Sequence, residues 1–227
     1  MEIVKARAER TGGKPVRVPR PMPLSFTLAR LSIQGDVRYS SAMAATPSAM
    51  LALGTKLPEF SLVDTISGKP VSGASLRGKV GVVVAFICNH CPYVVHIRHE
   101  FTKVAHEALD ANLAVVAINA NSEESHPQDG PGPMKELARA EGWRFPYLFD
   151  ASQDVARAFD AACTPDIFLF NGEHELVYRG QFDDSRPSNG KPVTGADLRR
   201  AIAAVVAKKP VSAEQKPSIG CNIKWKS

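Results

Sequence analysis

The sequence has no hydrophobic run long enough to cross a bilayer. Its 227 residues are 44% hydrophobic and 22% charged, which is the composition of an ordinary globular protein. Every apolar stretch is shorter than the roughly 18 to 20 residues that a membrane-spanning helix needs. The N-terminal region also lacks the apolar core of a secretory signal peptide. We therefore expect a cytoplasmic protein without a membrane span.

Cysteine is scarce, with four residues at positions 88, 91, 163 and 221. A secreted scaffold held together by disulfides is shorter and much richer in cysteine. Reactivity is therefore the better reason to examine these thiols. The sequence also has no glycine-rich phosphate loop, which argues against a nucleotide site.

Most of the chain carries no net charge. The formal net charge is +5, and residues 1–46 account for all of it, with eight Lys and Arg against three Asp and Glu. Residues 47–227 are neutral overall. A neutral globular domain has no general electrostatic attraction for DNA or RNA, so we expect no nucleic-acid partner.

Residues 1–46 show no sustained helical or strand periodicity. Their mixture of arginine, proline, glycine and serine is typical of a disordered extension. The segment also fits an organelle-targeting peptide, or a translation start at Met43 or Met50. We expect the folded domain to span residues 47–210 and a C-terminal tail, residues 211–227, to pack on it.

Strand-like and helix-like periodicities alternate through the folded part. Strands are predicted at residues 80–87, 112–120 and 145–150, with hairpins over 59–72 and 165–182 that turn at Ser67-Gly68 and Asn171-Gly172. Helices are predicted over residues 92–112, from Met134, over 152–161 with a serine cap, and over 194–209 capped by Thr194. Residues 121–133 are predicted to be a solvated loop. This order indicates an α/β fold with a central mixed sheet and helices on both faces.

Cys88 and Cys91 lie where a predicted buried strand ends and a helix begins. At this edge of an α/β sheet active sites gather. A thiol at a helix N-terminus meets free backbone N–H groups and the positive end of the helix dipole, which favour the thiolate. Because the thiolate is the nucleophile in disulfide exchange, this position predicts reactivity. His90, between the two cysteines, should lower the pKa of Cys88 further.

The same segment permits a second interpretation. Cys88 and Cys91 are followed by His96 and His99, a spacing that superficially resembles a Cys2His2 metal site. On the predicted helix these histidines lie about 200° from the apolar stripe that begins at Val94, so they face solvent. We expect no bound metal, and a non-catalytic copper- or zinc-binding module stays an alternative.

A family resemblance rests on the segments GTKLPEFSLVDTISGKPVS (54–72), CNHCPY (88–93), CTPDIFLF (163–170) and YRGQFDD (178–184), with the tail PSIGCNIKWK (217–226). In this order they resemble the thioredoxin-fold redoxin superfamily. Within it, they are similar to the peroxiredoxin-like group related to alkyl hydroperoxide reductase and thiol-specific antioxidant proteins. The resemblance implies a thioredoxin-like fold, with the first hairpin at its N-terminus, and a redox-active disulfide.

The resemblance also implies roles by position. Cys88 corresponds to the attacking cysteine of a thioredoxin CxxC, and Cys91 to the cysteine that resolves the mixed disulfide. Thr164 and Pro165 correspond to the loop with a cis-proline that faces the CxxC and holds the substrate. In a peroxiredoxin, the peroxidatic cysteine precedes a proline, as Cys91 precedes Pro92 here.

Two departures from the family patterns limit these roles. Val84 and Cys88 stand where the peroxiredoxin motif Pro-x-x-x-Thr-x-x-Cys has its proline and threonine, so we do not expect fast peroxidase chemistry. Val82 stands where thioredoxins usually bury an aspartate that relays a proton. Proton transfer must then use His90, water or an acid that the sequence does not identify.

Three further residues are candidate accessories. Cys163 lies two residues before Pro165 and fits a buried structural thiol better than a catalytic one. Cys221, followed by Trp225, is similar to the resolving cysteine in the tails of two-cysteine peroxiredoxins, and otherwise the tail only packs on the domain. Arg179 is either a surface partner or the arginine that peroxiredoxins place near their reactive cysteine.

We therefore expect a thiol–disulfide oxidoreductase with Cys88, Cys91 and His90 as catalytic residues and Thr164 and Pro165 as substrate-binding residues. Its partners would be a disulfide substrate and a thiol reductant such as thioredoxin or glutathione. It needs no cofactor beyond its own disulfide. A thiol peroxidase that reduces hydroperoxides is the first alternative.

Overall fold

The computed structural model describes residues 45–76 and 79–226, so the predictions for residues 1–44 lie outside the described part of the chain. None of the described helices is both long and apolar enough to cross a membrane. The elements follow in this order: β1 (Ala45–Pro47), β2 (Ser61–Asp64), β3 (Pro70–Ser72), η1 (Gly73–Leu76), β4 (Gly81–Phe86), α1 (Pro92–Asp110), β5 (Ala114–Asn119), η2 (Pro127–Asp129), α2 (Pro131–Ala140), β6 (Tyr147–Phe149), α3 (Asp154–Ala158), β7 (Cys163–Thr164), β8 (Asp166–Asn171), β9 (Leu176–Gly180), α4 (Ala196–Val206) and β10 (Ile219–Asn222).

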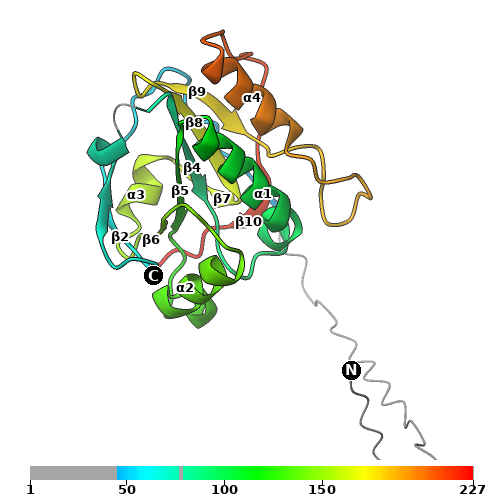
Figure 1. Cartoon of the computed structure of the whole chain (residues 1–227). Helices are drawn as coiled ribbons and strands as arrows, with labels where there is room; N and C mark the ends of the chain where they lie inside the picture. Colours follow the sequence, from blue (N-terminus) through cyan, green and yellow to red (C-terminus); the bar gives the residue numbers. More distant parts are fainter. Residues whose placement is uncertain (1–44, 77–78, 227) are drawn as a thin grey trace, which may run out of the picture. The chain divides into compact units, whose positions relative to one another are not determined.

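A seven-stranded mixed sheet forms the centre of the domain, in the order β3-β2-β6-β5-β4-β8-β9 (Figure 1). β5 pairs in parallel with both β4 and β6, and the other neighbours are antiparallel. β4 and β5 are buried along their whole length, because they lie centrally with both faces covered. The predicted α/β fold with a central mixed sheet is confirmed.

Side chains of β4 alternate between two cores. Val83 and Ala85 point into the core that α1, α2 and α4 cover, whereas Val82, Val84 and Phe86 point into the core that α3 covers. Figure 1 shows α1 and α4 on one side of the strands and α3 on the other. A strand covered on both faces needs apolar side chains at every position, which explains its unbroken apolar run.

The start of α1 is fixed by its sequence. Pro92 occupies the first helical position, where its missing N–H leaves no hydrogen bond unmade. Val94, Ile97 and Phe101 follow at spacings of three and four and are buried in the α1 core. This packing holds the residue before the helix, Cys91, against the end of the sheet.

A smaller sheet joins distant parts of the chain in the order β1-β10-β7. β10 pairs antiparallel with both neighbours, so that Cys221 lies opposite Ala45 on one side and Thr164 on the other. Strand β1 begins two residues before the domain boundary that we placed at residue 47, and β10 lies within the tail. Part of the C-terminal tail is therefore a central strand of this sheet.

The N-caps of two helices differ from our predictions. Gln153 directly precedes α3, although Ser152 Oγ accepts a hydrogen bond from the backbone N–H of the first helical residue, Asp154, at 3.2 Å. Gly195, rather than Thr194, directly precedes α4. Both Gln153 and Gly195 have positive φ. At α4 the Asp183 carboxylate accepts hydrogen bonds from the backbone N–H groups of Thr194 and Gly195, at 2.6 and 2.7 Å. These two N–H groups precede the first helical residue, Ala196, so Asp183 fixes the segment that leads into α4.

Candidate active site

Cys88 and Cys91 flank the turn between β4 and α1. β4 ends at Phe86, and Cys91 is the N-cap residue of α1, with extended backbone angles. Both side chains are buried, with exposed fractions of 1% and 0%. The pair thus occupies the edge of the sheet at which β4 ends, where α/β proteins bind their ligands.

The loop before β8 faces the two cysteines. The Thr164–Pro165 peptide bond is cis, as the resemblance implies. The Thr164 hydroxyl oxygen lies 3.4 Å from Cys88 Sγ, and its carbonyl oxygen lies 3.1 Å from Cys91 Sγ. One residue of this loop therefore contacts both sulfur atoms.

A third sulfur atom completes a cluster, which we call the three-thiol cluster: Cys88, Cys91 and Cys221. Cys221 Sγ lies 2.8 Å from Cys91 Sγ, and all three are free thiols in the structure. β10 brings Cys221 to this position by pairing with Thr164. A Cβ atom on Gly220 would overlap the Thr164 carbonyl oxygen, so β10 approaches this closely because residue 220 has no side chain.

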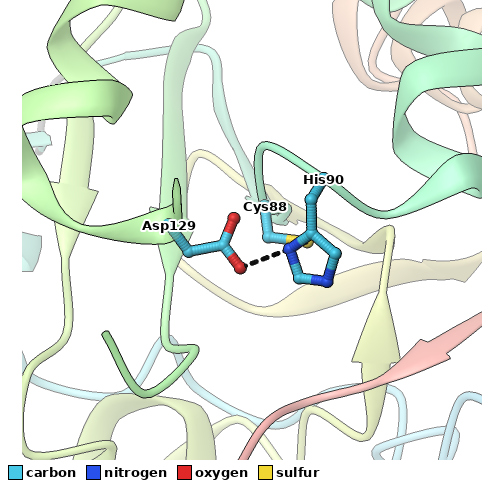
Figure 2. A group of neighbouring side chains, drawn as sticks. All are labelled: Cys88, His90 and Asp129. Atoms are coloured by element: carbon cyan, nitrogen blue, oxygen red, sulfur yellow. Dashed lines mark hydrogen bonds and ion pairs between the residues drawn. The ribbon is translucent and has the colours of Figure 1, made fainter. Parts of the chain in front are cut away.

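A single buried carboxylate fixes the two residues between the cysteines. Asp129 Oδ2 accepts a hydrogen bond from His90 Nδ1 at 2.6 Å, the dashed line in Figure 2. Asp129 Oδ1 accepts a second from the backbone N–H of Asn89 at 2.9 Å, and Asn121 Nδ2 donates to Oδ2 at 2.8 Å. Cys88 Sγ lies 4.0 Å from the same His90 nitrogen. Asp129 therefore holds the turn between the cysteines in one conformation.

Asp129 is an acid beside the cysteines that we did not anticipate from the sequence. It belongs to η2, within the segment that we predicted to be a solvated loop, yet its side chain is fully buried. Although burial raises the pKa of Asp129, hydrogen bonds from His90 and Asn121 hold it below the usual value. The prediction of a solvated loop is wrong at this residue, because its carboxylate finds three donors inside the fold.

His126 is a second residue of this segment that carried no signal in the sequence. Its ring stacks on His90, with centroids 4.9 Å apart and planes 21° apart. Burial lowers the pKa of His126, and the nearby His90 lowers it further. The lowered pKa favours the neutral form of the ring that stacks on His90.

The three thiols of the cluster differ in pKa because they make different contacts. Hydrogen bonds from Cys221 and Cys88 lower the pKa of Cys91, against the effect of burial. The hydrogen bond with Cys91 and burial raise the pKa of Cys88, and the negative charge of Asp129 raises it further. Contact with Cys91 and burial likewise raise the pKa of Cys221. The first thiolate to form therefore lies on Cys91.

The pKa of Cys88 thus moves in the direction opposite to our prediction from His90. The causes are the hydrogen bond with Cys91 and burial, whereas His90 Nδ1 lies 4.0 Å from Cys88 Sγ and only 2.6 Å from Asp129 Oδ2. The carboxylate also adds a negative charge close to the sulfur. The hydroxyl of Thr164, by contrast, lowers the Cys88 pKa by hydrogen bonding to the sulfur.

Cys163 is buried near the cluster but is bonded elsewhere. Its thiol donates to the Pro165 carbonyl at 3.5 Å, and its partner across the small sheet is Asn222. Burial raises its pKa. These contacts are those of a structural thiol.

Asp166 is a second buried acid that we did not anticipate. It follows Pro165 at the start of β8, and its side chain is fully buried. Burial raises the pKa of Asp166 to about 7, although hydrogen bonds from Ser48 and from the backbone N–H of Ala162 oppose the shift. Its protonation state therefore changes near neutral pH.

Arg179 lies apart from the cluster. It pairs with Phe168, which packs in the α3 core, whereas its neighbour Tyr178 packs in the α1 core with Cys88. Neighbours in a strand point to opposite faces of a sheet, so Arg179 lies on the face away from the cysteines. Its guanidinium donates to Gln215 Oε1 at 2.8 Å.

The histidines of α1 do not reach the cysteines either. His96 Nε2 lies 2.8 Å from Ser185 Oγ, and His99 Nδ1 lies 2.9 Å from Glu141 Oε2. The His99 side chain is exposed. The Cys2His2 arrangement that the spacing suggested is therefore not formed.

A different set of residues could hold a metal ion. Cys88, His90 and Asp129 each offer one donor atom, and these atoms lie within 4.8 Å of one another (Figure 2). Thiolate, imidazole and carboxylate are all ligands of Zn²⁺. Because His90 already donates to Asp129, a metal ion would have to replace that hydrogen bond.

A small pocket opens beside the cis-proline. Its lining combines apolar residues, among them Tyr93, Ile97, Pro165, Phe182 and Ile219, with polar ones, among them His96, Gln181, Ser185 and Arg186. It therefore lies between the first turns of α1 and the start of β10.

A known family matches the part of the chain that carries this site. The AhpC/TSA family matches residues 53–179, a range that contains Cys88, Cys91, Thr164 and Pro165 and ends before Cys221. No protein of curated function matches the chain.

Two solved structures match over most of the chain. An uncharacterized conserved protein from Geobacillus kaustophilus is 47% identical, with a TM-score of 0.80, over 82% of this chain and 98% of its own. A hypothetical protein from Sinorhizobium meliloti 1021 is 49% identical, with a TM-score of 0.78, over 80% and 99%. Peroxidoxin BcpB from Mycobacterium tuberculosis shares the fold at 18% identity, with a TM-score of 0.52, over 69% and 97%. Since the family match spans more than half of the 227 residues and the fold is that of thioredoxin-like redoxins, this protein belongs to the AhpC/TSA family.

Proposed function

We propose that this protein is a thiol–disulfide oxidoreductase whose redox centre is the Cys88–Cys91 dithiol. Cys88 attacks the substrate disulfide, and Cys91 resolves the mixed disulfide. The observation that supports this most directly is that Thr164, beside a cis-proline, contacts both sulfur atoms, at 3.4 and 3.1 Å. A substrate chain bound along this loop would meet the dithiol directly.

The thiol contacts define how protons move in this reaction. In this scheme Cys91 holds the thiolate, because its contacts with Cys221 and Cys88 lower its pKa, and Cys88 begins as a thiol. When Cys88 Sγ attacks a disulfide RSSR, its proton passes to Cys91, a Cys88–SR bond forms and RS⁻ leaves. RS⁻ takes that proton, and the regenerated Cys91 thiolate displaces the second RS⁻, which water protonates. The products are two thiols and a Cys88–Cys91 disulfide, which an external thiol reductant such as thioredoxin or glutathione reduces.

His90 acts in this scheme by position. Its Nδ1 proton is bound to Asp129 at 2.6 Å, and Asn89 is bound to the same carboxylate. His90 and Asp129 therefore hold the turn so that Cys88 Sγ stays 3.4 Å from the Thr164 hydroxyl oxygen.

A trapping experiment tests the proposed roles. Reduced Cys91→Ser protein is mixed with oxidised glutathione and its intact mass is measured. We expect a stable glutathione adduct on Cys88, because the resolving thiol is gone. Cys88→Ser should form little adduct, and Cys163→Ser, a matched buried-thiol control, should form the internal disulfide as the wild type does.

The adduct's position decides the outcome. Glutathione on Cys91 in the Cys88→Ser variant, with none on Cys88 in Cys91→Ser, would reverse the two roles. If neither variant forms an adduct and the wild type forms no disulfide, the protein is not a thiol–disulfide oxidoreductase.

Peroxidase chemistry is the second candidate, and burial favours it. Cys88 is 1% exposed, so a peroxide reaches its sulfur more easily than a bulky disulfide does. Thr164 also supplies a hydroxyl beside Cys88 Sγ, although the family threonine is replaced. A thiolate would attack ROOH to give a sulfenic acid and ROH, and the neighbouring thiol would then form the disulfide and release water. Hydrogen peroxide in place of oxidised glutathione tests this, with the sulfenic acid trapped by dimedone.

A metal-binding role is the third candidate, supported by the Cys88, His90 and Asp129 donor set. Titration of the reduced protein with Zn²⁺ tests it by calorimetry. One equivalent bound by the wild type and none by Cys88→Ser would support a metal site. Protection of Cys88 and Cys91 from alkylation by that metal would argue against both redox functions.

A further inference from the structure

We propose that Cys221 is a third redox-active cysteine, which takes over the disulfide from Cys88 and leaves it bonded between Cys91 and Cys221. This inference rests on the proposed function, because it begins from a Cys88–Cys91 disulfide. It assigns catalytic chemistry to a residue of β10, outside residues 53–179 that match the family.

Cys91 is the centre of the three-thiol cluster. Its sulfur lies 2.8 Å from Cys221 Sγ, and Thr164 contacts both this sulfur and Cys88 Sγ, at 3.1 and 3.4 Å. Cys91 can therefore exchange one sulfur partner for the other with little movement of the backbone. Disulfide exchange requires such a thiol adjacent to the disulfide sulfur that it attacks.

The fold holds Cys221 in this position from several directions. Cys221 pairs with Thr164 across the small sheet, and the absence of a side chain at Gly220 allows that close pairing. After the strand, the backbone N–H of Lys224 donates to Asn121 Oδ1 at 2.9 Å. The same Asn121 donates to Asp129, so the strand with Cys221 and the turn with Cys88 share one polar support.

Cys163 shows that burial near the cluster is not enough to bring a thiol into contact with Cys91. It lies one residue before Thr164, but its sulfur is bonded to the Pro165 carbonyl. Its pKa is raised by burial, with no thiol among its hydrogen-bond partners in the described residues. Cys221, by contrast, meets the sulfur at the centre of the cluster.

The exchange step is balanced without any added oxidant. The Cys221 thiol gives up its proton and attacks Cys91 Sγ of the Cys88–Cys91 disulfide. The Cys91–Cys221 bond forms, the Cys88–Cys91 bond breaks, and Cys88 leaves as a thiolate that takes up a proton. One disulfide replaces another, so the oxidation state of the protein does not change.

The step returns Cys88 to its reduced form while the disulfide moves to two buried sulfur atoms. The side chains of Cys91 and Cys221 are 0% and 3% exposed. Cys88 is equally buried, at 1% exposed, so the exchange moves the disulfide among three buried sulfur atoms and frees Cys88 as a thiol.

A time course on the unmodified protein tests the exchange. The reduced full chain is mixed with oxidised glutathione, quenched with acid at intervals, alkylated and digested with trypsin. Cys88 and Cys91 share the tryptic peptide of residues 80–98, whereas Cys221 lies in a separate peptide. We expect the internal Cys88–Cys91 disulfide first, then a cross-link between the two peptides, which fragmentation assigns to Cys91 and Cys221.

The same time course is then measured on matched variants. In Cys221→Ser the reaction should stop at the Cys88–Cys91 disulfide, whereas Cys163→Ser should form the cross-link as the wild type does. In Cys88→Ser the cross-link should form at least tenfold more slowly. Because the first measurement uses the wild type, a variant that fails to fold leaves the test intact.

The outcomes separate this inference from the proposed function. If the Cys88–Cys91 disulfide forms and Cys221 stays fully alkylated at every time, the exchange is refuted and the oxidoreductase stands. If the Cys91–Cys221 cross-link forms while Cys88 is never oxidised, transfer from Cys88 is refuted. If no cysteine is oxidised, the proposed function fails as well.

Discussion

Cys91 and Cys221 are 130 residues apart in the sequence, but their sulfur atoms lie 2.8 Å apart in the folded protein. β10 makes this contact by pairing with β7, the strand that carries Thr164. The loop that contacts both cysteines of the CxxC and the third thiol therefore belong to one small sheet. Any change in the position of that sheet alters all three sulfur contacts together.

Gly220→Ala should separate Cys221 from Cys91. Its Cβ would overlap the Thr164 carbonyl oxygen, and β10 would have to move away. Overpacking of this kind costs about 1–3 kcal/mol, so we expect the free energy of unfolding in urea to fall by about 2 kcal/mol. Gly132→Ala is the control, because a Cβ there meets open space near the start of α2. Equal stability of Gly220→Ala and the wild type would contradict the close approach.

Asp129→Asn should make Cys88 easier to ionise. The carboxylate raises the pKa of Cys88 through its charge, and the amide has none, so alkylation of Cys88 should be faster at pH 7. Loss of the charged hydrogen bonds to His90 and Asn89 should also destabilise the protein by about 1.5–3 kcal/mol. Glu124→Gln removes an exposed charge nearby and should change neither quantity. Slower alkylation of Cys88 in Asp129→Asn would show that the carboxylate assists ionisation.

Thr164→Val should have the opposite effect on the same thiol. The hydroxyl lies 3.4 Å from Cys88 Sγ and lowers the Cys88 pKa. Valine keeps the shape but removes this donor, so the pH at which Cys88 alkylation reaches half its maximum should rise. Thr164→Ser retains the hydroxyl and should restore the wild-type profile. A profile that is the same in all three proteins would rule out this hydrogen bond as a determinant of Cys88 ionisation.

Asp166→Asn should alter how stability depends on pH. The folded-state pKa of Asp166 is about 7, well above the usual value of about 3.9 for an aspartate in an unfolded chain. Between these values the folded state binds more protons, so the stability from this group is present below about pH 4 and is lost as the pH rises through 7. The asparagine variant should therefore gain stability relative to the wild type between pH 4 and 8, by up to about 4 kcal/mol.

Thermal or urea unfolding at several pH values measures this gain. Asp160→Asn changes an exposed carboxyl a few residues away and should run parallel to the wild type. If the Asp166→Asn curve also runs parallel to the wild type, the carboxyl does not titrate in this range.

Much of the fold follows from local patterns. The unbroken apolar runs of β4 and β5 indicate strands covered on both faces, and the spacing of Val94, Ile97 and Phe101 indicates the helix that covers one of them. The helix caps were harder, because the start of α4 is held by Asp183, which binds the backbone N–H groups of Thr194 and Gly195 just before the helix. Local sequence does not report such a partner.

Some residues of the candidate site could likewise be predicted from the sequence, and others could not. The CxxC at a strand–helix junction and the Thr164-Pro165 loop could be recognised from short segments and the family that they resemble. Asp129 could not, because its segment is polar and rich in glycine and proline, which is typical of a solvated loop. It is buried because Asn89, His90 and Asn121 satisfy its carboxylate.

The sequence by itself determined the α/β fold and the dithiol at the start of α1, because each depends on periodicity or on residues that are neighbours in the chain. The loop opposite the dithiol followed from the resemblance to the redoxin superfamily. The tertiary structure decided which thiol ionises first and which third thiol joins the pair. These properties depend on the distances from Cys91 to Cys221 and from Cys88 to Asp129, and hydrogen bonding and electrostatics act over a few ångströms regardless of separation along the chain.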